Sequence, residues 1–190
     1  MITSTSSSQV KHVVNLQKKA KLRKEEKQFV VEGVKMVSEA PADRLVKVYV
    51  SETFKADNEE FLERMNYDSI GKDVLEIVTD NVFMRMADTQ TPQGIMAVVR
   101  MSDTDLEGIL SDKHNPLLLI IENLQDPGNL GTIVRMAEGA GVTGIIMSSN
   151  TVDIYNPKTI RSTMGSLYRV PVIYCLLYTS DAADDRISVD

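Results

Sequence analysis

The sequence has very few of the residues that build disulfide frameworks, metal centres and hydrolase triads. Its 190 residues include one cysteine, Cys175, and two histidines. A single cysteine excludes an internal disulfide and a cysteine-based metal cluster, which fits a reducing compartment. Neither His12 nor His114 stands near a candidate serine nucleophile, as a hydrolase triad requires. We therefore expect no metal ion and no triad chemistry.

Long apolar runs are also absent. No run approaches the roughly 18 residues that a membrane span requires, and the opening stretch MITSTSSSQVKH lacks the apolar core of a secretory signal. We expect a cytoplasmic protein that makes no membrane contact. The apolar fraction of 43% is that of a globular chain, and the length suits one domain or two small ones.

Positive charge is scarce overall but concentrated near the N-terminus. The net charge is −6, which argues against a uniformly basic nucleic-acid binder. Between residues 11 and 27, however, only Glu25 and Glu26 oppose seven cations, which are Lys11, Lys18, Lys19, Lys21, Arg23, Lys24 and Lys27. A local basic patch can bind a phosphate backbone whatever the total charge. A solvated helix face is the alternative that this pattern leaves open.

Helical and strand patterns alternate along the chain, which predicts an α/β fold. Helices are expected over residues 7–24, 34–40, 58–65, 80–88, 130–141 and 156–168. Strands are expected over residues 29–33, 45–51, 74–79, 93–101, 116–121, 142–148 and 169–174. Residues 102–115 look like a polar helical connector, and we place a domain boundary there.

The loop ENLQDPGN follows an apolar run that is typical of a buried parallel strand. Its glycine would let the backbone approach a ligand closely, although a plain tight turn is the alternative. The spacing matches neither GxGxxG nor GxxxxGK(S/T), so a dinucleotide site or P-loop is not supported. In the helix that follows, Ile133, Ala137 and Ala140 are spaced to form its apolar face.

Two consecutive helices are expected to carry arginines near their N-termini. Arg135 is expected in the first turn of the first helix, and Arg161 with Ser162 early in the second. A helix N-terminus carries partial positive charge, so a cation there indicates a negatively charged partner or a stray surface residue. The second helix has Asn156 in position to cap it and Pro157 at its first position.

Two segments together resemble a known family. ENLQDPGNLGTIVRMAEGAG followed by NPKTIRSTMGSLYRVPV resembles the first two signature motifs of the SpoU-type (TrmH-like) RNA ribose 2′-O-methyltransferases, in matching order and spacing. The lysine-rich N-terminal helix, QFVVEGVKMVSEA and DTQTPQGIMAVV resemble that family's RNA-binding substrate domain. The likeness covers residues 8–174 of the chain.

The resemblance implies two domains. Residues 1–101 would form a small L30e-like domain that binds the RNA substrate, and residues 116–174 part of an α/β-knot (SPOUT) methyltransferase domain, with residues 102–115 between them. The cofactor would be S-adenosylmethionine, and the acceptor a ribose 2′-hydroxyl of structured RNA such as ribosomal RNA. The full-length protein would be a homodimer.

The resemblance also assigns site residues. Asn129 and Arg135 match the family's catalytic asparagine and arginine. Cofactor contacts would come from Pro157 and Gly165, and RNA or substrate contacts from Lys11, Lys18, Lys19, Arg23, Arg161 and Ser162. Because a guanidinium keeps its proton up to a pKa above about 12, we expect Arg135 to hold a phosphate and orient the hydroxyl rather than act as a base.

The resemblance ends after residue 174. The family's third motif, with its G-x-E-x-x-G loop and S-L-N-type segment, does not occur in this chain. The tail at residues 175–190, CLLYTSDAADDRISVD, has no helical or strand period and looks like a foreign junction. We therefore expect this chain to lack a complete cofactor site and to bind S-adenosylmethionine weakly or not at all.

Two other functions are left open. A non-catalytic RNA-binding protein with a degenerate methyltransferase domain is favoured by the missing third motif and opposed by the motif arginine. A nucleotide-binding α/β enzyme of another class is disfavoured by the spacing of the glycine loop. Methyl transfer into RNA separates the methyltransferase from the first alternative, and binding of a mononucleotide without RNA would indicate the second.

Overall fold

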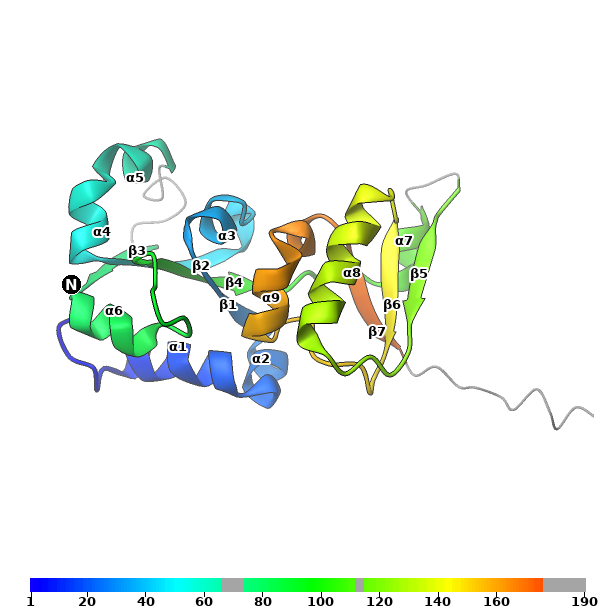
Figure 1. Ribbon diagram of the computed structural model, residues 1–190, viewed down its shortest axis with the longest axis horizontal. Coiled ribbons are helices and arrows are strands. Elements are labelled where there is room, and N and C mark those ends of the chain that lie inside the picture. Colours follow the sequence, from blue (N-terminus) through cyan, green and yellow to red (C-terminus); the bar gives the residue numbers. More distant parts are fainter. Residues whose placement is uncertain (66–73, 112–114, 176–190) are drawn as a thin grey trace, which may run out of the picture.

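The computed structural model describes residues 1–65, 74–111 and 115–175. Two β-sheets follow one another along the long axis of the molecule, each flanked by helices (Figure 1). The N-terminal half contains α1 (Ser8–Lys18), α2 (Ala20–Glu26), β1 (Gln28–Glu32), α3 (Val34–Ser38), η1 (Ala42–Arg44), β2 (Leu45–Ser51), α4 (Glu52–Asp57), α5 (Glu59–Met65), β3 (Leu75–Val78), α6 (Asp80–Met86) and β4 (Ile95–Arg100). The C-terminal half contains α7 (Leu106–Ser111), β5 (Leu118–Ile121), α8 (Pro127–Gly139), β6 (Gly144–Ser148), α9 (Pro157–Thr163), η3 (Ser166–Tyr168) and β7 (Val172–Cys175).

The first sheet has the strand order β1-β4-β2-β3 and is buried on both faces. Strand β4 runs antiparallel to β1 and β2, whereas β2 and β3 are parallel. Successive side chains of a strand point to opposite faces. Val98 accordingly packs with α1 and α6 on one face, while Ala97 and Val99 join the core that α3 covers on the other.

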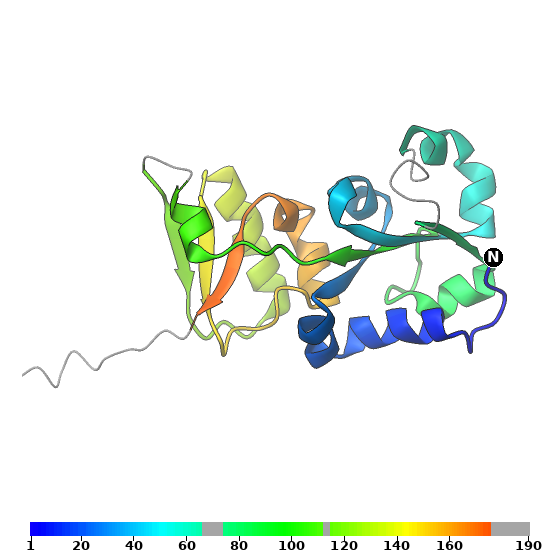
Figure 2. The same cartoon turned by 180° about the vertical axis from the view of Figure 1, so that it is seen from behind.

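The second sheet is parallel throughout, with the strand order β5-β6-β7. This confirms the expected α/β architecture. Helix α8 covers one face, and Figure 2 shows α7 on the opposite face. Ile109 of α7 is 3% exposed and lies against Gly144 of β6, so the expected polar connector contains a helix that packs on the sheet.

One apolar core runs through both halves of the molecule. The same cluster of buried side chains contains Phe29 and Val99 from the first sheet and Leu130 and Ile160 from α8 and α9. The rings of Phe29 and Tyr155 lie 4.7 Å apart between their centroids. Because both halves contribute side chains to it, this shared core holds the two halves together.

Two long helices that the sequence pattern predicts are each interrupted. The helix expected over residues 7–24 breaks at Lys19, whose backbone is extended (φ −114°, ψ 101°). The helix expected over residues 156–168 ends at Thr163, because Met164 (φ 53°) and Gly165 (φ 98°) are left-handed. A single α-helix cannot continue through left-handed residues, so η3 follows as a separate turn.

The sequence pattern missed helix α4. Its N-cap is Ser51, whose hydroxyl accepts a hydrogen bond from the Phe54 N–H at 3.1 Å. A serine in this position satisfies one of the free N–H groups of the first turn. The pattern placed Ser51 at the end of a strand instead, and β2 does end there.

Candidate functional site

The loops that follow β5 and β6 are joined at the carboxyl ends of their strands. The N–H of Asn123 donates to Ser148 Oγ at 3.0 Å, and Gln125 Nε2 donates to the carbonyl of Asn150 at 2.7 Å. Ligands of open α/β sheets bind outside the carboxyl ends of the strands. This joined edge is therefore the candidate site.

Helix α8 begins earlier than the sequence pattern predicts. Its first residue is Pro127, and the Asp126 carboxylate caps it by accepting a hydrogen bond from the Asn129 N–H at 2.6 Å. Asn129 therefore lies in the first turn. Arg135 is the ninth residue of α8, about 12 Å along the axis from Pro127, so its expected place in the first turn is wrong.

Asn129 and Arg135 are both exposed but point in different directions. Six residues along an α-helix correspond to a rotation that separates them by about 120° around the axis. Among the described residues, none forms a hydrogen bond or ion pair with the Arg135 side chain. Its guanidinium is therefore available to an external anion. Arg135 lies four residues after Gly131 and seven after Gly128, so it starts from the side of α8 that faces α9.

The buried face of α8 also differs from the expected one. Leu130, Val134 and Ala137 are buried, whereas Ala140 lies beyond the end of the helix and is exposed. The spacing i, i+4, i+7 is the one that the pattern predicts, but it begins at Leu130 rather than Ile133. The earlier start of the helix is not the reason for this difference. The buried face is the one that packs against the sheet.

Helices α8 and α9 pack closely because Gly131 has no side chain. A Cβ at this position would lie 2.7 Å from the carbonyl oxygen of Thr159 and would also collide with Cβ of Ser162. Figure 1 shows the two helices side by side. The Ser162 hydroxyl turns back to donate to the carbonyl of Lys158 at 3.0 Å. The two motif helices thus form one unit at the candidate edge.

The start of α9 confirms the expected cap. Asn156 Oδ1 accepts a hydrogen bond from the Lys158 N–H at 2.9 Å, and Pro157 occupies the first helical position. Proline suits this position because its missing N–H would have no partner within the helix. Local sequence chemistry therefore determines where this helix begins.

The cations that are expected to contact RNA fall into two groups. Lys11, Lys18 and Lys19 are exposed on α1 and at its end. Arg23 is only 3% exposed and forms an ion pair with Asp153, at 2.6 Å from Nη2 to Oδ2. The structure therefore corrects the expectation for Arg23, because its guanidinium is buried within the protein and not presented to an external phosphate.

Arg161 and Gly165 face the N-terminal half of the molecule. Arg161 Nη1 donates to Asp88 Oδ2 at 2.6 Å, with each side chain 39% exposed. Gly165 packs against Glu39, whose carboxylate would collide with a Cβ at this position. Arg161 is exposed enough to exchange its partner for a phosphate, so its RNA contact stays a prediction.

Two further contacts cross between the halves. The Tyr168 hydroxyl donates to the carbonyl of Met36 at 2.8 Å, and burial raises the pKa of that phenol. Arg169 binds Glu39, at 2.7 Å, and Glu138 together. The Arg169 hydrogen bond lowers the pKa of Glu138. The segment from α9 through η3 is thus anchored to the N-terminal half by several independent groups.

The cavity beside Pro157, one of the two residues expected to bind the cofactor, is smaller than a cofactor. The cavity that Pro157 and Arg161 line has a volume of about 10 Å³, about the space of one water molecule. Small-molecule sites have volumes of about 300–1,000 Å³. The cavity beside Pro157 therefore does not fit S-adenosylmethionine by itself.

The described residues offer neither a metal-binding cluster nor a membrane-spanning helix. Within residues 1–65, 74–111 and 115–175, no group of three or more His, Cys, Asp or Glu side chains could hold a metal ion. Over the same residues, no helix has the length and apolar character that crossing a membrane requires.

Comparison with known families matches both halves of the chain. A family model described as the SpoU rRNA Methylase family matches residues 116–184, and one described as the MRM3-like substrate binding domain matches residues 7–97. The chain belongs to the SpoU rRNA methylase family. The SpoU match extends ten residues past Tyr174, into the segment expected to be anomalous; residues 176–190 lie outside the described residues.

Named relatives of this SpoU family chain include mitochondrial and bacterial enzymes. The rRNA methyltransferase 3, mitochondrial, of Xenopus laevis is 33% identical over 172 residues, which cover 86% of this chain and 39% of the relative. The 23S rRNA (guanosine(2553)-2′-O)-methyltransferase RlmP of Bacillus subtilis is 36% identical over 97 residues, covering 51% and 37%. The chain thus spans less than half the length of these two relatives.

A solved structure resembles the SpoU family chain over nearly its whole length. The AdoMet-bound rRNA methyltransferase from Sinorhizobium meliloti matches with a TM-score of 0.77 and 25% identity. The match covers 93% of this chain and 64% of that protein. The arrangement of the two sheets is therefore that of a known methyltransferase structure.

Sequence reasoning missed the partners that join the two halves of this SpoU family chain. Asp153, Asp88 and Glu39 receive hydrogen bonds from Arg23, Arg161 and Arg169. These partners are separated by 73 to 130 residues along the chain. A single sequence contains no local spacing pattern from which such a distant pair could be recognised. Only the position of Asp153, three residues before the Asn156 cap, placed it near the second motif.

Proposed function

We propose that this chain, within its complete gene product, acts as an S-adenosylmethionine-dependent methyltransferase on a ribose 2′-hydroxyl of ribosomal RNA. The observation that carries the proposal is the joined edge of β5 and β6, where Gly131 lets the two motif helices pack as one unit. The printed names of the relatives support it, since one is a 2′-O-methyltransferase of 23S rRNA and another an rRNA methyltransferase. The AdoMet-bound structural neighbour supports the cofactor.

In this proposal Asn129 and Arg135 serve catalysis from α8. Asn129 lies in the first turn, where its side-chain amide can donate to and accept from ribose hydroxyls. Arg135 presents a guanidinium that is free of partners among the described residues. Its planar fork of N–H donors suits a phosphate. We propose that Arg135 holds the phosphate and orients the 2′-hydroxyl. It would accelerate the reaction by positioning the substrate.

The basic surface of α1 serves binding. Lys11, Lys18 and Lys19 are exposed and would contact the phosphate backbone of the RNA. The N-terminal half, which matches an MRM3-like substrate binding domain, would form the RNA-binding domain, and the L30e-like fold stays part of this proposal. Pro157 and Gly165 would contribute to the cofactor site only together with chain outside the described residues, which for the relatives makes up more than half of their length.

The deciding experiment measures transfer of a radiolabelled methyl group from S-adenosylmethionine into ribosomal RNA by the complete gene product. Alkaline hydrolysis then maps the site, because a 2′-O-methyl group protects the adjoining phosphodiester bond. We expect one protected ribose. A label found on a base would contradict 2′-O transfer.

A non-catalytic RNA-binding protein is the second candidate. The observation that favours it is the cavity of about 10 Å³ beside Pro157, which admits no cofactor. Under our proposal the 190-residue chain binds S-adenosylmethionine weakly or not at all, while the complete gene product binds it. Calorimetry with S-adenosylmethionine on both proteins decides between the candidates. If the complete gene product does not bind the cofactor, the second candidate is supported. If the 190-residue chain binds it with micromolar affinity, the expectation of an incomplete site is refuted.

Assembly and location complete the proposal. We propose a homodimer for the complete gene product, which light scattering after size-exclusion chromatography would measure. Met136 on α8 is 68% exposed and Met164 is 43% exposed, so the motif helices offer apolar surface to a second subunit. A cytoplasmic location also remains a proposal, as the relatives include a mitochondrial and a bacterial protein.

A further inference from the structure

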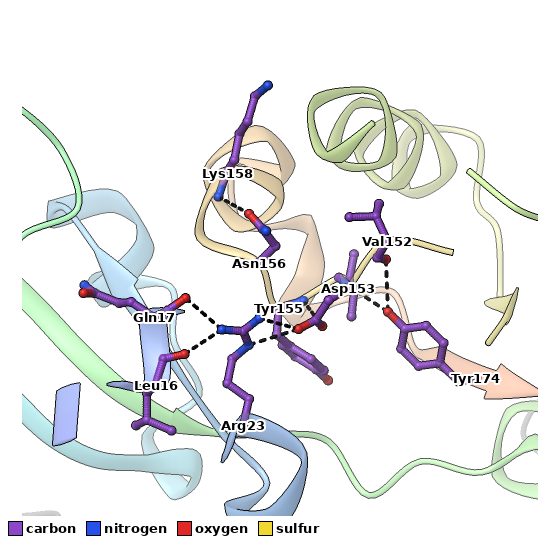
Figure 3. Close-up of polar contacts among 10 residues, drawn as sticks. Leu16, Gln17, Arg23, Val152, Asp153, Tyr155, Asn156, Lys158 and Tyr174 are labelled. Carbon is purple, nitrogen blue, oxygen red and sulfur yellow. Dashed lines mark hydrogen bonds and ion pairs between the residues drawn. The ribbon is translucent and has the colours of Figure 1, made fainter. Parts of the chain in front are cut away.

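The buried guanidinium of Arg23 joins three segments of the chain (Figure 3). From α2, its Nη1 donates to the carbonyls of Leu16, at 2.6 Å, and Gln17, at 2.8 Å. Its Nε and Nη2 both donate to Asp153 Oδ2, at 3.0 and 2.6 Å. The first two bonds satisfy carbonyls near the end of α1, and the other two reach the loop between β6 and α9.

Asp153 transmits this contact to the start of α9. While Oδ2 accepts from Arg23, Oδ1 accepts a hydrogen bond from the Tyr155 N–H at 2.9 Å. The next residue, Asn156, is the N-cap of α9. The Arg23 guanidinium therefore acts on the turn from which the second motif helix starts.

A second contact anchors α9 farther along. Arg161 binds Asp88, and the N–H of Asp88 in turn donates to Glu32 Oε2 at 2.9 Å. Glu32 ends strand β1 and Asp88 follows helix α6, so both belong to the N-terminal half. Helix α9 is thus attached to that half at its start and in its second turn.

The chemistry of the Arg23–Asp153 pair suits a geometric role. The two side chains are 3% and 16% exposed, and removing charges from water has a cost that the mutual attraction must offset. Such pairs add little net stability. They favour one geometry, and here four of the five N–H donors of Arg23 have an acceptor. Lysine cannot replace arginine here, because a single ammonium does not present the planar fork that reaches both α1 and Asp153.

We propose that Arg23, acting through Asp153, is a positioning residue that sets the orientation of the basic helix α1 relative to α9. This orientation selects which ribose of a bound RNA reaches Asn129 at the joined edge of β5 and β6. The selection of a ribose rests on the proposed function. The geometric part does not, because it concerns only how the two halves of this chain are held.

The geometric part is tested by measuring a distance between the halves in solution. Spin labels are attached at Lys55→Cys on α4 and Met136→Cys on α8, both exposed positions, in a Cys175→Ser background. We expect a narrow distance distribution for Arg23 and a broader or shifted one for Arg23→Gln. The matched control is Lys21→Gln, which removes the same charge from an exposed position of α2 and should leave the distribution narrow.

A second variant keeps the test decisive if Arg23→Gln does not fold. Asp153→Asn leaves one acceptor oxygen, which cannot serve both the Tyr155 N–H and Arg23 as the carboxylate does. It should broaden the same distribution. If a folded Arg23→Gln or Asp153→Asn variant keeps the wild-type distribution, the proposal is overturned, even where the variant melts at a lower temperature.

The functional part is tested in the complete gene product with ribosomal RNA. We expect Arg23→Gln to lower kcat by about 100-fold, or to move the methyl group to another ribose, with RNA affinity unchanged. A different result would overturn the proposal and show that Arg23 contacts phosphate. In that case the variant would lose RNA affinity, its RNA affinity would depend less steeply on salt concentration, and its distance distribution would be unaltered. If the wild-type protein transfers no methyl group, the proposed function fails, while the distance measurement still decides the geometric part.

Discussion

Two arginines of this chain occupy opposite environments although both were expected to meet RNA. Arg135 is exposed and has no partner among the described residues, whereas Arg23 is 3% exposed and makes four hydrogen bonds. An arginine that spends four of its five N–H donors inside the protein contributes to structure. One with free donors at the surface can bind an anion, so of these two arginines Arg135 remains the candidate for an RNA contact.

The first prediction concerns Arg135. Replacement Arg135→Lys in the complete gene product should lower methyl transfer by roughly 100-fold, because an ammonium cannot hold a phosphate with two parallel hydrogen bonds. RNA affinity should change little, since the charge is kept. Single-turnover transfer and fluorescence anisotropy measure the two quantities. Arg85→Lys, at an exposed position of α6, is the control, and an unimpaired rate in Arg135→Lys would refute the assigned role.

At the scale of elements, α8 and α9 behave as one unit. Each helix is capped by a side chain of the preceding loop, Asp126 for α8 and Asn156 for α9, and each starts with proline. Their close contact depends on Gly131, which faces Thr159 and Ser162. A side chain at this point must push the helices apart, because backbone atoms cannot move aside as a flexible side chain can.

The second prediction uses two glycines of α8. Gly131→Ala should lower the free energy of unfolding by about 1–3 kcal/mol, because the new Cβ would collide with α9. Gly139→Ala is the matched control, since a Cβ there meets nothing within 4 Å. It should raise stability by about 0.5–1 kcal/mol through helix propensity. Urea titration of both variants measures the difference, and equal effects would contradict the close packing.

At the scale of the whole molecule, charged groups link the two halves beside the shared core. Arg169 lies between Glu39, which follows α3, and Glu138 of α8. Arg161 and Arg23 make comparable links to Asp88 and Asp153. Ion pairs between the halves make their docking sensitive to pH, whereas the apolar core does not.

The third prediction concerns acid. Hydrogen bonds from Arg169, and then Ser166, lower the pKa of Glu138 below its ordinary value of 4.5. A carboxylate with a lowered pKa in the folded state contributes stability above its ordinary pKa and loses it as pH falls through the lowered value. Glu138→Gln should therefore flatten the loss of stability below pH 4.5. Thermal melts across this range test it, with Glu63→Gln, an exposed residue of α5, as control.

The fourth prediction concerns salt. If Lys11, Lys18 and Lys19 neutralise phosphates, RNA affinity should fall as salt rises, with a slope of log K against log salt of about −0.7 to −0.9 per contact. Lys18→Gln together with Lys19→Gln should reduce the slope by about 1.5. Lys55→Gln, on the far helix α4, should leave it unchanged. An affinity that does not depend on salt would exclude the phosphate contacts.

The part of the fold that could be predicted is the part with local causes. The apolar run before the motif loop becomes the parallel strand β5, and Asn156 with Pro157 starts α9 as expected. The start of α8 was misplaced by three residues because Pro127 and Gly128 look like loop residues, although proline is well suited to the first turn of a helix. The break at Lys19 was not predicted. It precedes helix α2, whose Arg23 pairs with the distant Asp153.

Local patterns in the chain were enough to predict the α/β alternation, the start of α9 and the order of the two motifs, because each of these depends on residues within a few positions of one another. Which cations remain at the surface, and which residues join the halves, depends on the packing of distant segments. Arg23 and Asp153 are 130 residues apart, and their pairing follows from the packing of both sheets on one core. The charge pattern shows where the cations lie along the chain. Whether a cation such as Arg23 is buried depends on the segments that pack around it in the folded protein.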